Sequence, residues 1–256
     1  MKTLNFFIIF HDKLFQENTS GFSENELETF FTWVAVNEKI PKEFPSWIPK
    51  NSLLKEYEMK QHCPLYQMLH FYQNSVFFHL YKNKELINSK YIGFGQYDMS
   101  FQSDEFRKTH GVLKDDTADK IVVAFPFPFR GLCDEDLLPN WKRMFLDPYN
   151  SFYGTNHTFE NVKNLPLFLC HTFIIPTWFF LHMMPFAESI LPNVLRELDW
   201  TTRHLGGTYE RVFALCISFG IFEGKFRQIL QLDGVSHIES QHSVDVLRGI
   251  NAGCVK

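Results

Sequence analysis

The sequence predicts an α/β fold, because short apolar runs alternate with segments that have the spacing of amphipathic helices. Several of the runs are continuous rather than alternating, which is typical of strands buried on both faces of a parallel sheet. With 256 residues the chain is long enough for one large domain, and it contains no internal repeat. The apolar runs occupy residues 4–10, 31–36, 91–97, 121–125 and 165–175.

Composition excludes several classes of protein. The net charge of −4 gives no basic surface for phosphates, so we expect no nucleic-acid partner. The N-terminal apolar run is too short for a signal peptide, and histidines and prolines interrupt the run at 165–186, so we expect no integral membrane segment. Five cysteines without a CxxC pair indicate reduced thiols, and we expect a soluble, cytoplasmic protein. The glycosylation sequon at Asn18 carries no weight in such a chain.

The first part of the chain predicts two strands and a short helix. The strand at 4–10 is followed directly by a polar loop that contains His11 and Lys13. Loops in this position line the ligand crevice of an open α/β sheet, so His11 to Lys13 is a candidate nucleotide contact. An acidic segment after Ser23 suits the first turn of a helix, and the second strand then ends at Asn37.

A strand that ends in a carboxylate forms the centre of the predicted site. Pro64 opens a helical pattern that continues to Leu80, and this helix leads into the strand at 91–97. Asp98 follows where the apolar run stops, and a carboxylate in that place can hold Mg²⁺ or Mn²⁺ against a substrate diphosphate. The alternative is a turn in which Asp98 caps backbone N–H groups.

The second half predicts fewer elements. We expect a buried strand at 165–175 with His171 in its middle and a helix at 186–198. A last helix, with apolar residues from Val212 to Phe219, has Glu210 at its entrance. Three polar or weakly patterned segments predict turns, loops and an irregular tail, namely 101–120, 147–164 and 232–256.

Five short blocks carry a resemblance through their order and spacing. They are Phe10-His11-Asp12-Lys13, Tyr81-Lys82-Asn83, Lys90-Tyr91-Ile92-Gly93-Phe94 with Tyr97 behind it, Cys170-His171-Thr172-Phe173-Ile174-Ile175, and Gly207-Thr208-Tyr209-Glu210-Arg211. Together they resemble capsular-polysaccharide-type glycosyltransferases of the nucleotide-sugar-dependent GT-A class, and the related sugar transferases of large DNA viruses of algae. The match touches positions 4 to 220.

The resemblance implies a mainly parallel sheet flanked by helices, as in Rossmann-like nucleotide-sugar-binding domains. It implies transfer of a sugar from a nucleoside diphosphate, with a UDP-sugar as the expected donor, to a hydroxyl of a glycan or glycoprotein. We expect one domain over 1–256, with a donor-binding half at about 1–130, an acceptor-side half at about 131–230 and a tail at 231–256. The expected donor contacts are His11, Lys13, Asn37 and Tyr97.

The resemblance also assigns roles in catalysis. Asp98 is expected to hold Mn²⁺ or Mg²⁺, with His171 as a second metal ligand, and Glu210 to take the proton of the acceptor hydroxyl. The relatives carry a basic residue where this chain has Asp98, and Ser100 replaces the second acid of an Asp-x-Asp motif, so the metal assignment stays open. His171 is otherwise a buried core histidine, and Glu210 otherwise stabilises a helix N-terminus or pairs with a neighbouring arginine.

Two other functions fit the same sequence. The first is a catalytically silent sugar- or nucleotide-binding protein on the same fold, with Trp33, Trp47 and Trp178 as platforms for sugar rings. The second is a metal hydrolase built on the eleven histidines, which is weaker because no H-x-H or HExxH spacing occurs.

Overall fold

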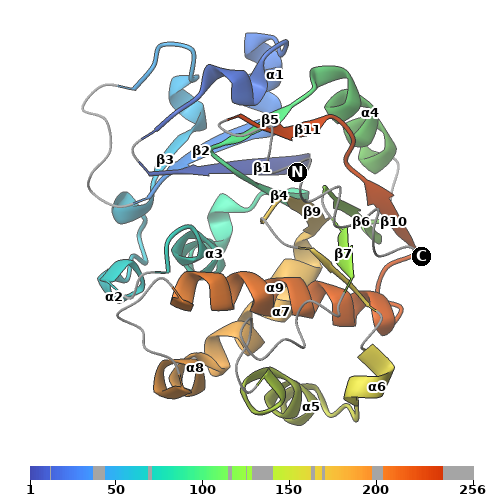
Figure 1. The fold of residues 1–256 in the computed structure, drawn as a ribbon. Helices are drawn as coiled ribbons and strands as arrows, with labels where there is room; N and C mark the ends of the chain where they lie inside the picture. Colours follow the sequence, from blue (N-terminus) through green and yellow to red (C-terminus); the bar gives the residue numbers. More distant parts are fainter. Residues whose placement is uncertain are drawn as a thin grey trace.

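The architecture is that of a computed structural model (Figure 1). It describes residues 1–11, 13–36, 44–68, 71–114, 117–124, 126–128, 141–162, 165–168, 171–197 and 204–238. Within these residues a central sheet of seven strands runs in the order β10-β6-β9-β4-β1-β2-β3. All neighbouring pairs are parallel except those of β9, which is antiparallel to both β4 and β6. The predicted α/β fold with a mainly parallel sheet is therefore confirmed.

The strands of the central sheet follow the apolar runs of the sequence. Their bounds are β1 Lys2–Phe10, β2 Phe31–Ala35, β3 Leu53–Lys55, β4 Ser89–Gln96, β6 Lys120–Val123, β9 Phe173–Pro176 and β10 Gln228–Gln231. Two smaller antiparallel pairs accompany it. The first joins β5 (Met99–Phe101) to β11 (Val235–His237), and the second joins β7 (Pro126–Pro128) to β8 (Pro166–Phe168). The β5–β11 pair brings the segment around 235–238 next to the end of β4.

Helices cover both faces of the sheet, with α1 and α4 on one face and α3, α7 and α9 on the other (Figure 1). Their bounds are α1 Glu24–Phe30, α2 Pro64–Met68, α3 Asn74–Lys82, α4 Ser103–Lys114, α5 Asp147–Tyr153, α6 Phe159–Val162, α7 Thr177–Ser189, α8 Leu191–Glu197 and α9 His204–Phe222. A capping box of Ser23 and Glu26 starts α1, where the sequence predicted a helix N-terminus.

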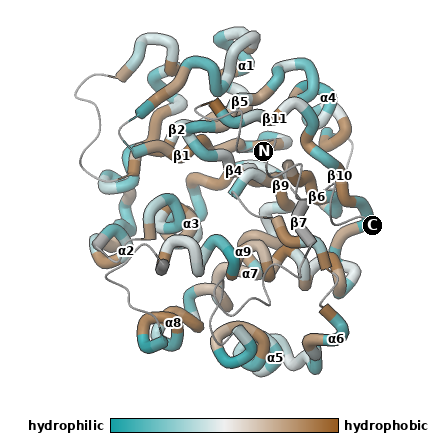
Figure 2. The backbone as a smooth tube through the Cα atoms, in the orientation of Figure 1, coloured by the Kyte–Doolittle hydropathy of each residue, from teal (hydrophilic) through white to brown (hydrophobic). Residues whose placement is uncertain are grey.

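Side chains of β1 alternate between two hydrophobic clusters. Phe6 and Ile8 pack with α1 and α4, whereas Phe7 and Ile9 pack with α3, α7 and α9. Hydrophobic stretches along β6 and β9 stand out in brown in Figure 2. Gly93 of β4 leaves the room that the ring of Phe6 fills, because a Cβ atom at this position would lie 2.3 Å from Phe6 Cδ2.

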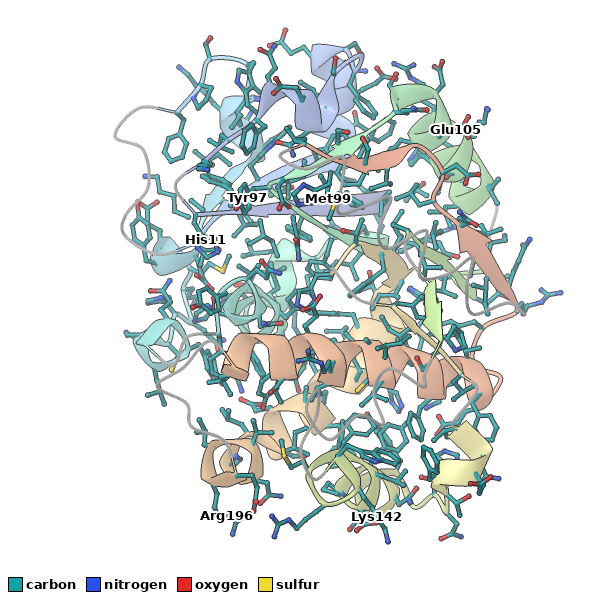
Figure 3. The ribbon with its side chains drawn as sticks, viewed as in Figure 1. His11, Tyr97, Met99, Glu105, Lys142 and Arg196 are labelled. Carbon is teal, nitrogen blue, oxygen red and sulfur yellow. The ribbon has the colours of Figure 1, made fainter. Side chains whose placement is uncertain are left out.

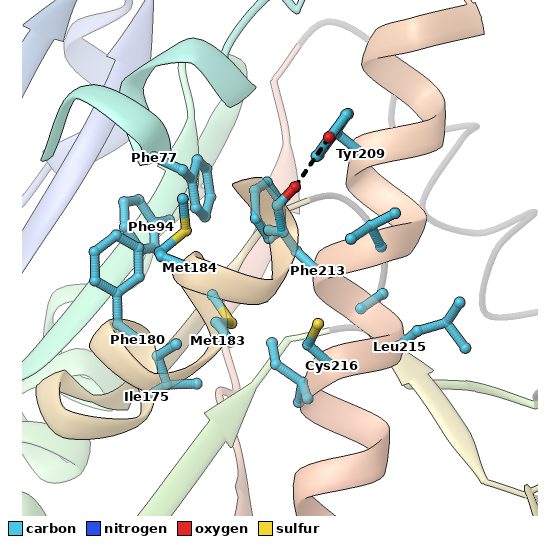
Figure 4. Close-up of a cluster of buried hydrophobic side chains, with 14 of the residues drawn as sticks. Phe77, Phe94, Ile175, Phe180, Met183, Met184, Tyr209, Phe213, Leu215 and Cys216 are labelled. Atoms are coloured by element: carbon cyan, nitrogen blue, oxygen red, sulfur yellow. Dashed lines mark hydrogen bonds between the residues drawn. The ribbon is translucent and has the colours of Figure 1, made fainter. Parts of the chain in front are cut away.

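The cluster under α9 is made largely of aromatic rings and methionine side chains from α3, β4, α7 and α9 (Figure 4). Phe77 stacks between Phe94 and Phe213, with ring centroids 4.1 and 4.6 Å apart. The hydroxyl of buried Tyr209 donates a hydrogen bond to the carbonyl of Ala187 at 3.0 Å. Many of the phenylalanine side chains are therefore buried in the hydrophobic core.

Three predicted elements are wrong in their extent. The helix expected from Pro64 to Leu80 is interrupted, because Tyr72 has a left-handed backbone with φ of 52° and α3 begins only at Asn74. The strand expected at 165–175 is two strands in different sheets, since His171 turns the chain with φ of 44°. The helix expected at 186–198 is the end of α7 followed by α8.

Polar segments that predicted turns or loops also form helices. Residues 101–120 include α4, which buries Phe106, His110 and Leu113 against the sheet. The expected loop at 147–164 contains α5 and α6. Helix α4 was missed because its few apolar residues form a narrow stripe in an otherwise charged segment. The expected irregular tail contains β11, which buries Val235.

Candidate functional site

Predicted site residues follow the carboxyl ends of β1 and β4. Ile9 pairs with Gln96 in the parallel ladder, so His11 and Tyr97 leave two adjacent strands close to the same edge of the sheet. Figure 3 labels His11, Tyr97 and Met99 in this region. The ring of Tyr97 stacks on Phe15, with centroids 6.1 Å apart.

Lys13 and Asn37 are the other two residues expected to contact the donor. Lys13 is exposed, so its side chain is accessible to an anionic ligand from solvent. Asn37 lies outside the described residues. The ring of His11 lies 6.3 Å from that of Tyr72, in the turn between α2 and α3, so this turn also reaches the edge of the sheet.

Asp98 lies in the turn between β4 and β5 and is only 9% exposed. Its Oδ2 lies 2.8 Å from Nε2 of His237, the last residue of β11. Its Oδ1 is buried and has no hydrogen-bond partner among the described residues. A buried carboxylate oxygen without a partner costs about 1–3 kcal/mol or more, so it is a natural ligand for a cation or a donor group of a substrate. Capping of backbone N–H groups, the alternative reading of the sequence, therefore does not account for Oδ1.

His237 is a site residue that the sequence analysis missed. It lies in the segment expected to be irregular, far along the chain from Asp98. The pairing of His237 with Met99 between β11 and β5 places its ring beside the carboxylate. The only local signal was the alternation of Val235, Ser236 and His237, which is too short to predict a strand.

His171 and Glu210 lie in a second part of the candidate site. His171 is 2% exposed, and its ring lies 5.1 Å from that of Phe77 and 6.1 Å from that of Phe213. Burial lowers its pKa, and the nearby Glu210 carboxylate partly offsets this effect. The structure thus brings His171 and Glu210 close enough to interact electrostatically. His171 Nε2 is buried and has no hydrogen-bond partner among the described residues.

Helix α9 positions Glu210 well inside its length rather than at its entrance. Glu210 lies about two turns after His204, too far for the helix N-terminal charge to act on it strongly. The side-chain amide of buried Asn74 donates to the carbonyls of Phe71 and Gly206, at 2.8 and 2.9 Å. This amide ties the first turn of α9 to the turn that carries Tyr72.

Lowered histidine pKa values predict that acid destabilises the fold. Burial lowers the pKa of His110, His171 and His182, and Lys114 and Lys225 lower those of His110 and His182 further. In the unfolded chain these rings titrate near 6.5, so below that pH the unfolded state binds more protons and the free energy of unfolding falls.

We expect urea unfolding to give a lower free energy at pH 5.5 than at pH 7.5, by up to about 1.4 kcal/mol per pH unit for each ring that stays neutral. His171→Asn, which tolerates the left-handed backbone, should reduce this pH dependence. An equal pH dependence in the variant would contradict the contribution of His171.

Comparison with known proteins shows a similar fold in a solved glycosyltransferase structure. No protein-family model and no curated protein sequence matches the chain. The apo structure of the bifunctional glycosyltransferase WbbM matches with a TM-score of 0.58 and 12% identity, over 93% of this chain and 45% of WbbM. The chain shares the fold of part of this glycosyltransferase. It spans less than half the length of WbbM.

A second match is more distant. It is core-mannan synthase A from Aspergillus fumigatus in its Mn/GDP form, with a TM-score of 0.43 and 10% identity over 93% of this chain and 75% of the synthase.

The described residues hold no group of three or more histidines, cysteines, aspartates or glutamates that could bind a metal ion. Asp98 supplies one potential ligand, Oδ1, because its Oδ2 is in contact with His237 Nε2 at 2.8 Å, so a divalent ion would need further oxygen atoms from water or substrate. The expected metal ligand His171 lies close enough to Glu210 for the carboxylate to raise its pKa, and its role as a ligand stays a prediction. In the part of the chain that the structure describes, no helix has the length and hydrophobicity to cross a membrane.

Proposed function

We propose that this chain is a GT-A-type glycosyltransferase that moves a sugar from a nucleoside diphosphate, most simply UDP, to a hydroxyl of a glycan. The observation that carries the proposal is the shielded carboxylate of Asp98 at the carboxyl end of β4, whose Oδ2 contacts His237 and whose Oδ1 has no partner in the described part of the chain. Ligands of open α/β sheets bind at this edge. The glycosyltransferase fold supports the reaction class.

A divalent cation, Mn²⁺ or Mg²⁺, fits the donor set at Asp98. Oδ1, which has no hydrogen-bond partner among the described residues, is a hard oxygen ligand, and the contact of Oδ2 with His237 Nε2 holds the carboxylate in place. When bound, the ion would offset the negative charge that develops on the diphosphate leaving group. Asp98 would hold it through Oδ1, His237 would orient the carboxylate, and diphosphate oxygens would supply further ligands.

The remaining roles follow from position. His11, Lys13 and Tyr97, together with Asn37, would contact the nucleotide, within a donor-binding half at about 1–130. Glu210 on α9, in an acceptor-side half at about 131–230, would accept the proton of the acceptor hydroxyl as its oxygen bonds to the sugar. Burial lowers the pKa of His171 and so favours its neutral form near the Glu210 carboxylate.

The sugar-binding alternative finds little support in the tryptophan side chains. Trp33 is fully buried, with its ring 5.8 Å from that of Trp47, so it offers no platform to a glycan. Trp178 is 43% exposed, and its Nε1 donates a hydrogen bond to the carbonyl of Ala118. A single exposed ring is a common surface feature.

A donor screen tests the proposal. The purified chain is incubated with UDP- and GDP-sugars, with Mn²⁺, with Mg²⁺ or with EDTA, and release of the nucleoside diphosphate is measured. We expect slow hydrolysis of one donor that depends on the divalent ion. Heat-denatured protein is the control, and binding of glycans without any donor turnover would favour the sugar-binding alternative.

A further inference from the structure

Asn18 is a fully buried polar residue next to the candidate metal site. It lies in the short 3-10 helix η1 (Gln16–Thr19) and is 0% exposed. Its Nδ2 donates hydrogen bonds to the carbonyls of Tyr97 and Met99, both at 2.6 Å. These two carbonyls flank Asp98, so one side-chain amide forms hydrogen bonds to the backbone on both sides of this residue.

The contacts of Asn18 fix the orientation of its amide. Oδ1 is buried and has no hydrogen-bond partner among the described residues. Turning the amide over would place Oδ1 against two carbonyl oxygens, which repel it, so the arrangement with Nδ2 toward the turn is the favourable one. Within the residues that the structure describes, Oδ1 therefore stays without a partner, at a cost of about 1–3 kcal/mol, while both amide hydrogens bond the Asp98 turn.

The Asp98 turn depends on contacts with remote segments, because the ladder of the central sheet ends with β4 at Gln96. The N–H of Ile238 donates to the carbonyl of Asp98 at 2.7 Å, and Asn18 satisfies the carbonyls on either side. All three carbonyls of the turn thus receive donors from outside it. Two segments, one from each end of the chain, hold the carboxylate in place.

We propose that Asn18 is a positioning residue that holds the Asp98 carboxylate in the geometry for a divalent cation, an inference that rests on the proposed function. Residues that orient a metal ligand without touching the metal typically change metal affinity by about 10–100-fold when they are replaced. Asn18 bonds the backbone carbonyls on either side of Asp98 and not the Asp98 carboxylate itself. The same burial makes Asn18 inaccessible to glycosylation in the folded chain, so the sequon there is structural.

Two leucine substitutions separate positioning from stability. Asn18→Leu keeps the size of the side chain and removes both donors. Asn83→Leu is the matched control, because Asn83 is also 0% exposed and its amide donates to the carbonyls of Gln61 and His79, away from the site. We expect both variants to lose thermal stability. Only Asn18→Leu should weaken binding of Mn²⁺ in the presence of UDP, by about tenfold or more, as measured by calorimetry.

Hydrogen exchange gives a readout that needs no metal. In Asn18→Leu the amide of Ile238 should exchange about tenfold faster or more, because the turn that accepts its hydrogen bond moves, and in Asn83→Leu it should not. Wild-type values for both Mn²⁺ affinity and Ile238 exchange in a folded Asn18→Leu would overturn the proposal.

The experiment stays decisive if Asn18→Leu does not fold or if the wild-type chain binds no Mn²⁺. If Asn18→Leu does not fold, Asn18→Ser replaces it, since one hydroxyl can still serve one carbonyl, and effects between wild type and a complete loss are expected. If the wild-type chain binds no Mn²⁺ beside UDP, the proposed function loses its metal, whereas Ile238 exchange in the variants still decides whether Asn18 holds the turn.

Discussion

Replacing Asp98 with alanine is expected to reduce donor turnover to below about one hundredth of the wild-type rate, as loss of one preorganised charge-stabilising group does in other enzymes. The variant removes the buried carboxylate and leaves His237 Nε2 without the partner that it has at 2.8 Å. Turnover of the nucleotide sugar and binding of Mn²⁺ with UDP are measured on the same protein. Both should fall together, because the carboxylate acts through the cation.

Two variants show whether the effect of Asp98→Ala is local. Asp98→Asn keeps the shape of the side chain but removes its charge, so it should lose Mn²⁺ affinity while the fold is retained. Glu58→Gln alters a carboxylate that is 58% exposed and pairs with Lys55, and it should leave turnover unchanged. Wild-type turnover in a folded Asp98→Ala variant would remove the metal assignment from the proposed function.

Local features of the sequence predicted much of the fold around this site. The apolar runs at 4–10 and 31–36 became adjacent parallel strands, and the serine and glutamate at 23 and 26 formed the capping box of α1. The position of Asp98 after β4 was also predictable, because it depends only on where an apolar run stops. Such features are encoded within a few residues of each other.

Features that depend on distant contacts were not predictable from one sequence. His237 and Asn18 both contact the Asp98 turn, yet no periodic pattern connects them to it. The left-handed backbone at Tyr72 is set by packing, since an aromatic residue rarely adopts it, and histidine at position 171 tolerates it without a signal in the sequence. One sequence shows a polar side chain at each of these positions but not the partner, and the partner decides the role.

Replacing Glu210 with glutamine is expected to lower kcat by about 10²–10⁴-fold while the KM for the donor changes little, because a general base acts in the transition state and not in donor binding. Glutamine keeps the size of the side chain but cannot accept the proton of the acceptor hydroxyl. The position of Glu210 beside neutral His171, within α9 rather than at its start, supports this role over stabilisation of the helix end.

The control for this variant is Glu197→Gln. Glu197 lies on α8, where it pairs with the largely exposed Arg143, so its loss should leave both kinetic constants near those of the wild type. Steady-state kinetics with varied donor and acceptor concentrations separate the two constants. A Glu210→Gln variant with unchanged kcat and a raised KM for the donor would move Glu210 from proton transfer to substrate binding, because only ground-state contacts would then have been lost.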